Sequence, residues 1–182
     1  MATTLTTRSA LADIDGMEDM QRIVIMGVAG CGKSSVGAAL SAATGLPYRD
    51  GDDLHPPANV DRMAAGQPLT DADRWPWLDL VAAELATRAP LMIGCSALKR
   101  AYRDRIRQEA GGPVLFVHLS GSRSVIAARM AARTDHFMPV ALLDSQFAAL
   151  EPPGADEAHL TVDIDQPLAT IVARLCADLS PR

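Results

Sequence analysis

The stretch that decides the fold reads Gly27-Val28-Ala29-Gly30-Cys31-Gly32-Lys33-Ser34. It follows a short β-branched run at 23–26 and precedes apolar side chains at helical spacing, so it joins a buried strand to a helix. Its glycines allow consecutive backbone N–H groups to turn inward around phosphate oxygens, and the helix N-terminus adds a favourable dipole. We therefore predict a phosphate-binding loop in which Lys33 reaches the β- and γ-phosphates and the Ser34 hydroxyl binds Mg²⁺.

The rest of the chain repeats this alternation of strands and helices. Short apolar runs at 23–26, 46–50, 91–95, 114–119 and 160–164 predict five strands, with helices between them. Such alternation is typical of a parallel sheet covered by helices on both faces. One of these helices is expected to start at Asp73 as its N-cap, with Pro76 in its first turn. His118, inside the apolar run 114–119, is expected to be a core histidine with satisfied hydrogen bonds.

Composition limits the classes of protein to consider. The chain has 182 residues, 48% of them hydrophobic, which suits one domain with a substantial core. Its net charge of −5 argues against a protein that binds nucleic acid through a basic surface. Its three scattered cysteines suit neither a disulfide framework nor a zinc site. No apolar run is long enough to span a membrane, and no secretory leader is recognisable. We expect a cytoplasmic protein with a flexible tail at 1–20 and a single domain at 21–182.

A group of acids follows the second predicted strand, in the stretch Asp50-Gly51-Asp52-Asp53. The third predicted strand ends without an aspartate, which argues against motors, transporter ATPases and GTPase switches. The carboxyl ends of parallel strands meet at one edge of a sheet, so these acids should face the phosphate-binding loop. This arrangement favours a kinase in which one acid helps to position the metal and another holds the acceptor hydroxyl.

Two arginines, Arg129 and Arg133, lie four residues apart on one face of a predicted helix. Carried by a closing lid at about 129–140, they would stabilise the charge of a transferred phosphoryl group and exclude water. Spacing alone is also compatible with two solvated arginines on a helix surface.

The chain resembles gluconokinases, which are relatives of shikimate and adenylate kinases. The matching stretches are GVAGCGKS at 27–34, DGDDLHP at 50–56, PLTDADRWPWL at 68–78, CSALKRAYRDRIR at 95–107, RMAARTDHFMP at 129–139, SQFAALEPP at 145–153 and VDIDQPL at 162–168. The first stretch is generic, whereas CSALK, HFMP and SQFAALE are specific to this family. The resemblance implies a three-layer α/β/α P-loop kinase fold with a five-stranded parallel sheet and a helical lid.

The resemblance also implies a reaction, transfer of the γ-phosphate of ATP to the 6-hydroxyl of D-gluconate with Mg²⁺ as cofactor. The 6-phosphogluconate produced feeds the pentose phosphate and Entner–Doudoroff routes. Asp52 would bind and orient the acceptor hydroxyl, and Asp50 would act through the magnesium shell. By the same resemblance Arg129 would stack on adenine, Arg133 would contact phosphate, and the protein would be a homodimer.

A substrate with one carboxylate and a row of hydroxyls needs cations and hydrogen-bond donors in its pocket. The candidates at the predicted strand ends and on the lid side are His55, Arg74, Lys99, Tyr102, Arg103, His136 and Gln146.

Two other hypotheses stay open on the sequence. One keeps the same machinery but changes the acceptor to shikimate, a nucleoside or another sugar acid. The other is a regulator that holds ATP without turning it over. Replacing Asp52 by asparagine separates a kinase from a regulator, because a kinase should lose rate and keep its affinity for ATP.

Overall fold

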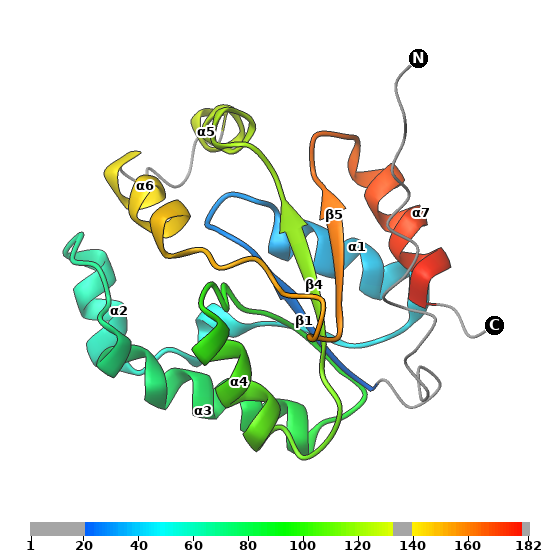
Figure 1. Ribbon diagram of the computed structural model, residues 1–182, viewed down its shortest axis with the longest axis horizontal. Coiled ribbons are helices and arrows are strands. Elements are labelled where there is room, and N and C mark those ends of the chain that lie inside the picture. Colours follow the sequence, from blue (N-terminus) through cyan, green and yellow to red (C-terminus); the bar gives the residue numbers. More distant parts are fainter. Residues whose placement is uncertain (1–20, 133–139, 180–182) are drawn as a thin grey trace.

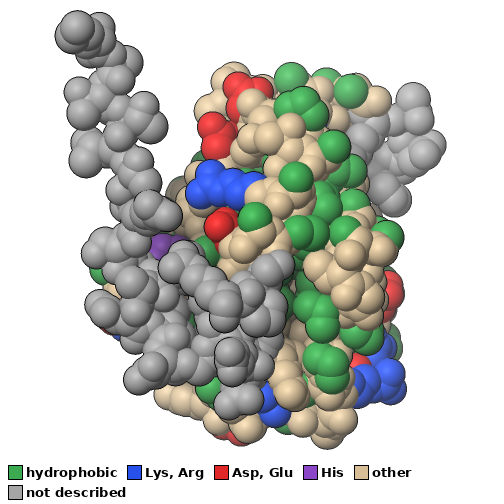
Figure 2. Space-filling view, turned by 90° about the vertical axis from the view of Figure 1, so that its right-hand side faces the viewer, with side chains coloured by type: hydrophobic (Ala, Val, Ile, Leu, Met, Phe, Trp, Pro, Cys, Tyr) green, Lys and Arg blue, Asp and Glu red, His purple; other side chains and the backbone are tan. Residues whose placement is uncertain are grey.

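The computed structural model describes residues 21–132 and 140–179. The predicted tail at 1–20 and most of the predicted lid segment therefore lie outside the described residues. Among the described residues, no helix is both long and apolar enough to cross a membrane. On the face shown in Figure 2, the described charged side chains form small groups of both signs among hydrophobic and uncharged ones.

The centre of the fold is a five-stranded sheet in the order β2-β3-β1-β4-β5, in which every pairing is parallel (Figure 1). The strands are β1 Arg22–Met26, β2 Tyr48–Asp50, β3 Leu91–Gly94, β4 Leu115–Ser120 and β5 His159–Asp163. The predicted parallel sheet of five strands is thus confirmed. Because β1 lies in the middle, the loop that follows it is flanked by loops from the strands on either side.

Helices cover both faces of the sheet. They are α1 Lys33–Thr44, α2 Pro57–Ala64, α3 Asp71–Thr87, α4 Arg100–Glu109, α5 Arg123–Ala131, α6 Val140–Ala149 and α7 Leu168–Leu179, with a short 3₁₀ helix at Gly51–Leu54. Alternate residues of β1 point to opposite faces, so Ile25 packs with α1, α5, α6 and α7 whereas Val24 packs with α3 and α4. Figure 1 shows α3 and α4 on one side of the sheet and α1 and α7 on the other.

The start of α3 corrects one prediction. Its N-cap is Thr70, whose hydroxyl accepts the Asp73 N–H at 3.3 Å, while the Asp73 carboxylate accepts the Thr70 N–H at 2.8 Å. Asp73 is therefore the third residue of a capping box, and Pro76 lies inside the helix rather than in its first turn. An interior proline costs about 3 kcal/mol, and burial of Leu78 and Val81 just beyond it offsets this at about 1.5–3 kcal/mol each.

His118 is buried, as expected, but its hydrogen bonding differs from the expectation. Only 3% of the residue is exposed, and its Nδ1 has no hydrogen-bond partner among the described residues. Burial, together with the charges of Arg103 and His159, lowers the pKa of His118 to about 4. The ring is therefore neutral at pH 7 and packs as an uncharged side chain on the α3–α4 side of the sheet.

The loops at the carboxyl ends of β1 and β3 are joined by backbone hydrogen bonds. Cys95 N–H donates to the Ile25 carbonyl at 3.0 Å, and Gly27 N–H donates to the Ser96 carbonyl at 3.3 Å. Gly27 has a φ of +144°, and a Cβ there would lie 2.9 Å from the Leu119 carbonyl oxygen, so only glycine fits. The loops after β1 and β3 thus leave the sheet side by side.

Candidate active site

The loop between β1 and α1 has the conformation that the sequence predicts for phosphate binding. The Lys33 ammonium donates to the carbonyls of Gly27 and Val28 at 3.2 and 3.3 Å, which holds it against the inner side of the loop. Gly30 and Gly32 have φ angles of +79° and +100°, a region that disfavours side chains. A Cβ on Gly30 would also lie 2.5 Å from Cγ of Met130 on α5, so this glycine is required twice over.

Ser34 and Asp50 meet across the gap between α1 and β2. The Ser34 hydroxyl donates to Asp50 Oδ2 at 2.7 Å, and Asp50 Oδ1 accepts the Asp52 N–H at 3.0 Å. A hydroxyl and a carboxylate are hard oxygen donors, and Mg²⁺ sites in kinases typically combine one or two such groups with substrate phosphates and water. The pair fits the predicted metal site.

Two glycines, one in α1 and one in β3, leave room for the side chain of Tyr48 at the start of β2. A Cβ on Gly37 of α1 would lie 2.2 Å from the Tyr48 ring, and one on Gly94 of β3 would lie 2.3 Å from the Tyr48 hydroxyl. The Tyr48 side chain therefore occupies the space that a side chain at position 37 or 94 would need. Burial, reinforced by the nearby Asp50 carboxylate, raises the pKa of Tyr48 far above its usual value, so the Tyr48 hydroxyl stays neutral.

Asp52 presents its carboxylate to solvent in front of the phosphate-binding loop. Its side chain is 70% exposed, yet protein atoms surround it closely enough to raise its pKa. Desolvation is the largest cause, the Lys33 charge opposes it, and Asp50 and Asp53 add repulsion. A carboxylate with a raised pKa is the type of group that accepts a proton from a hydroxyl.

His55 lies beside Asp52 but does not supply a cation. Its ring stacks on Trp77 with centroids 4.1 Å apart, and its Nε2 lies 3.9 Å from Asp52 Oδ1. Burial, with Arg74 as a secondary cause, lowers the pKa of His55 to about 4. The indole N–H of Trp77 donates to the Gly51 carbonyl at 2.7 Å and fixes this stack behind the acidic turn. His55 is thus a neutral partner for Asp52 or for a substrate hydroxyl.

Beyond Asp52, the starts of α3 and α4 form a basic cluster. Lys99 Nζ donates to both carboxylate oxygens of Asp71 at 2.8 Å, and the Tyr102 hydroxyl donates to the same carboxylate. The Lys99 ammonium and the Arg74 guanidinium lie 5.5 and 5.9 Å from the centroid of the Tyr102 ring. Arg74 forms no hydrogen bond or ion pair with the described residues. The structure brings together the predicted Arg74, Lys99 and Tyr102, and it adds Asp71, which the sequence reasoning missed.

Arg103 corrects the predicted set of substrate contacts. Its side chain is 1% exposed, and its Nε and Nη2 donate to Glu157 at 2.7 and 2.9 Å. Its Nη1 donates to the carbonyls of Ala97, Leu98 and Glu151. Burial alone would raise the pKa of Glu157, but hydrogen bonds from Arg103, Arg107 and the Gly154 N–H hold it far below its usual value. Arg103 is therefore a buried structural cation with no donor directed to a substrate.

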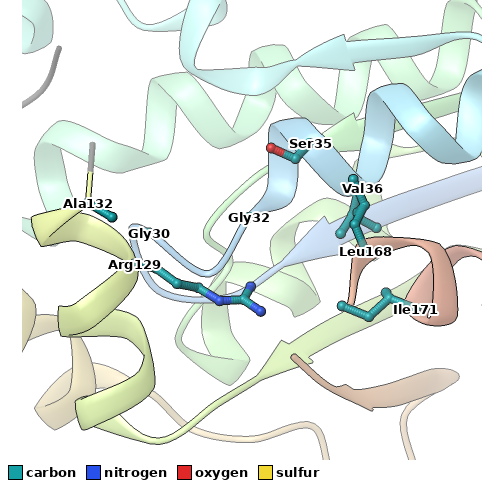
Figure 3. Close-up of a pocket in the computed structure, with 8 residues that line it drawn as sticks. All are labelled: Gly30, Gly32, Ser35, Val36, Arg129, Ala132, Leu168 and Ile171. Atoms are coloured by element: carbon teal, nitrogen blue, oxygen red, sulfur yellow. The ribbon is translucent and has the colours of Figure 1, made fainter. Parts of the chain in front are cut away.

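A pocket of about 340 Å³ lies between the phosphate-binding loop, α5 and the start of α7 (Figure 3). Its lining residues are Gly30, Gly32, Ser35, Val36, Arg129, Ala132, Leu168 and Ile171. Figure 3 shows the Arg129 side chain reaching from α5 past the glycine loop toward α7. Its guanidinium donates to the Ile164 carbonyl and, at 3.5 Å, to the Gln166 carbonyl. Arg133, predicted to contact phosphate, and His136, predicted to contact substrate, lie outside the described residues.

The chain is similar in sequence and in fold to known kinases. The thermoresistant gluconokinase of Escherichia coli (strain K12) is 46% identical over 156 residues, 82% of this chain and 88% of that protein. A crystal structure of a gluconokinase from Sinorhizobium meliloti 1021 is 52% identical, with a TM-score of 0.81 over 87% of this chain and 90% of that one. A shikimate kinase from Bacteroides thetaiotaomicron is 18% identical, with a TM-score of 0.63 over 87% of this chain and 97% of that one, and shares the fold alone.

No family model matches the chain. The relatives decide the family without one, because identity and coverage are both high. The predicted P-loop kinase fold is confirmed as well. The chain belongs to the gluconokinase family.

Proposed function

We propose that this protein transfers the γ-phosphoryl group of ATP to the 6-hydroxyl of D-gluconate, giving 6-phosphogluconate and ADP. The observation that carries the proposal is that the Lys33 charge reaches Asp52, while the Arg74 charge reaches His55, the neighbour of Asp52. A phosphate-binding lysine, a carboxylate for the acceptor hydroxyl and a cation for a substrate carboxylate thus follow one another. The relatives at 46–52% identity carry the name gluconokinase.

The nucleotide half of the site consists of the glycine loop and the pocket beside it. Backbone N–H groups of Gly30, Gly32, Lys33 and Ser34 would surround the phosphates, and the Lys33 ammonium is already oriented by the Gly27 and Val28 carbonyls. Arg129 lines the adjoining pocket, where we place the adenine base. Ser34 and Asp50 would hold Mg²⁺, which when bound neutralises phosphate charge.

In the acceptor half, Asp52 would accept the hydrogen bond of the 6-hydroxyl and take its proton as the bond to phosphorus forms. Its raised pKa makes it a stronger base than an ordinary aspartate. Phosphoryl transfer depends mainly on positioning and electrostatics, so a hydroxyl fixed between Asp52 and the γ-phosphate provides much of the catalysis.

The other end of gluconate is a carboxylate, and we place it against Arg74 and Lys99. The planar guanidinium of Arg74 forms no hydrogen bond or ion pair with the described residues and can bind both oxygens of a carboxylate. The Lys99 ammonium donates two hydrogen bonds to Asp71. An ammonium has three N–H donors, so one remains for a substrate oxygen. His55 would contribute a neutral contact to a substrate hydroxyl.

Three further proposals rest on family membership. Arg133 would contact the transferred phosphate, His136 would contact substrate from the lid side, and two copies of the chain would form a homodimer in the cytoplasm. Size-exclusion chromatography with light scattering distinguishes a dimer from a monomer.

A coupled assay with MgATP and a panel of acceptors tests the proposed function. The panel contains D-gluconate, shikimate, other sugar acids and nucleoside monophosphates. Turnover of gluconate far above every other acceptor supports the proposal, and loss of that turnover in Asp52→Asn with ATP binding retained assigns it to this site. Turnover of a different acceptor, or ATP binding without any turnover, would overturn it.

A further inference from the structure

Gln146 on α6 makes a contact that the roles assigned above leave unexplained. Its side-chain Oε1 accepts the backbone N–H of Ala29 at 2.6 Å, although the two residues are 117 positions apart. Figure 1 shows α6 on the same side of the molecule as the loop between β1 and α1. The sequence placed Gln146 among the candidate gluconate contacts, whereas the structure places it on the phosphate-binding loop itself.

The contacted peptide group lies at the phosphate-transfer end of that loop. Its carbonyl belongs to Val28 and accepts the Lys33 ammonium at 3.3 Å, while its N–H belongs to Ala29 and donates to Gln146. One peptide plane is thus held on opposite sides by Lys33 and Gln146. Lys33 is the residue that reaches the β- and γ-phosphates, and Gly30 and Gly32 lie on the other side, toward the Arg129 pocket. Gln146 therefore contacts the same peptide group as Lys33, the residue expected to reach the γ-phosphate.

The chemistry of a carboxamide suits that position. A glutamine has an acceptor oxygen and an amide nitrogen with two N–H donors. The oxygen is used by Ala29, and the amide nitrogen forms no hydrogen bond with the described residues. Because Oε1 is fixed, the orientation of the whole carboxamide plane is restricted, and the donors are kept close to the place where phosphate charge arrives. A glutamate would repel the phosphate.

The helix that carries Gln146 is anchored at two further points. Leu143, one turn earlier, is 1% exposed in the core. Glu151, just after the helix, accepts the Arg100 N–H at 2.6 Å and donates its own N–H to the Leu98 carbonyl at 2.9 Å. The position of Gln146 is therefore fixed relative both to the phosphate-binding loop and to the loop that carries Lys99.

We infer that Gln146 is a γ-phosphate-binding residue, oriented by the Ala29 N–H and donating through Nε2 to the γ-phosphoryl oxygens. It discriminates ATP from ADP and helps to hold the γ-phosphoryl group in line with the acceptor. The inference rests on the proposed function for its catalytic part, while its binding part concerns nucleotide alone.

Two substitutions and a neighbouring control test this inference. Gln146→Met keeps the length of the side chain and removes both hydrogen-bonding functions, whereas Gln146→Glu keeps the acceptor and replaces the donor by a charge. Ser145→Ala alters the adjacent exposed residue, whose hydroxyl donates within α6 to the Leu142 carbonyl. Titration calorimetry with Mg²⁺ measures binding of ADP and of a non-hydrolysable ATP analogue, and steady-state kinetics measures kcat and KM.

For Gln146→Met we expect the ATP analogue to bind about tenfold more weakly and ADP to bind within about twofold of the parent, since a lost hydrogen bond to a charged group has that size. The kcat should fall by about tenfold or more. Gln146→Glu should show a larger loss for the analogue, and Ser145→Ala should match the parent.

Equal losses for ADP and the analogue would mean that Gln146 only shapes the loop, and parent-like binding and kcat would mean that it does not touch phosphate. Either result overturns the inference. Thermal melts identify a variant that fails to fold, in which case the other variant decides. If the parent protein does not phosphorylate gluconate, the proposed function fails, but the comparison of ADP with the analogue still tests Gln146.

Discussion

The Ser34 hydroxyl donates a 2.7 Å hydrogen bond to Asp50 Oδ2, across the junction between α1 and β2. The second oxygen of Asp50 caps the turn that carries Asp52. A single carboxylate therefore joins the proposed metal position to the residue proposed to hold the acceptor hydroxyl. Removal of the whole Asp50 side chain should consequently affect both metal use and acceptor geometry.

We expect Asp50→Asn to raise the Mg²⁺ concentration needed for half-maximal activity by about tenfold or more, because a neutral amide is a weaker ligand for a hard cation. The Asp50 Oδ1 contact to the Asp52 N–H can persist in the amide, so the acidic turn should keep its shape. Activity measured against Mg²⁺ at saturating ATP and gluconate checks this. An unchanged Mg²⁺ dependence would show that Asp50 lies outside the metal shell.

Asp52→Asn should lower kcat by about a hundredfold or more, the usual size of a lost general base or orienting carboxylate. Binding of MgATP should stay within about twofold of the parent, because Asp52 faces the acceptor. Single-turnover kinetics and calorimetry measure the two quantities separately. A parallel loss of nucleotide affinity would place Asp52 in the nucleotide site instead.

The raised pKa of Asp52 also predicts a pH dependence. Desolvation and the neighbouring Asp50 and Asp53 charges raise this pKa, so protonation begins at a higher pH than for an ordinary aspartate. The rate should decline as pH falls through that raised pKa. Asp53→Asn removes one repelling charge and should move the acid limb of kcat/KM to lower pH. A limb that moves to higher pH would contradict this account of the carboxylate.

Arg74→Ala should raise KM for gluconate by about tenfold or more and leave KM for ATP unchanged, because a charge-assisted bidentate contact is lost only on the acceptor side. Arg105 provides a matched control, since it joins α4 to α3 through Asp79. Arg105→Ala removes a similar interhelical arginine away from the basic cluster and should leave both KM values unchanged. Equal behaviour of the two variants would remove Arg74 from the substrate pocket.

Lys99 and Arg103 show how far the sequence could predict this site. Both are cations in one stretch, CSALKRAYR, and the local sequence pattern predicts a substrate contact equally for both. Glu157 separates them, because it lies 54 positions after Arg103 and pairs with that residue inside the protein. The phosphate-binding loop was predictable because its residues act through their own backbone. Long-range partners such as Glu157 and Gln146 leave no local signal.

The start of α3 shows a second limit. Thr70 and Asp73 are both residue types that cap helices, and Pro76 fits the first turn of a helix that starts at Asp73. The structure uses both, as the two halves of a capping box, and this advances the helix by one turn. The tolerance of Pro76 depends on core packing after it, which no local preference reveals. Asp71, brought by this extra turn to Lys99 and Tyr102, was missed for the same reason.

The buried pair Arg103–Glu157 predicts a stability effect without a specificity effect. Arg103→Ala leaves Glu157 with only part of its hydrogen bonds and should reduce the free energy of unfolding by about 3–5 kcal/mol, the usual cost of an uncompensated buried charge. The folded fraction should keep its KM for gluconate, since the Arg103 side chain is buried and only 1% exposed. Urea unfolding and kinetics at low temperature measure both. A large selective rise in KM for gluconate would return Arg103 to the substrate pocket.

His55 and His118 predict that stability declines in mild acid. Both have folded pKa values lowered to about 4, against 6.5 for an ordinary histidine, so below pH 6.5 the unfolded chain binds protons that the folded chain excludes. The free energy of unfolding should therefore be constant above about pH 7 and fall as pH drops from 6.5 toward 4, by up to about 3 kcal/mol for each ring. His118→Leu removes one of the two contributions and should make the decline between pH 6.5 and 4 shallower. Urea titrations at pH 7.5, 6, 5 and 4.5 measure the slope. If the parent and His118→Leu lost stability in parallel, His118 would have to be protonated inside the fold, and the buried Nδ1 without a partner would then need a different explanation.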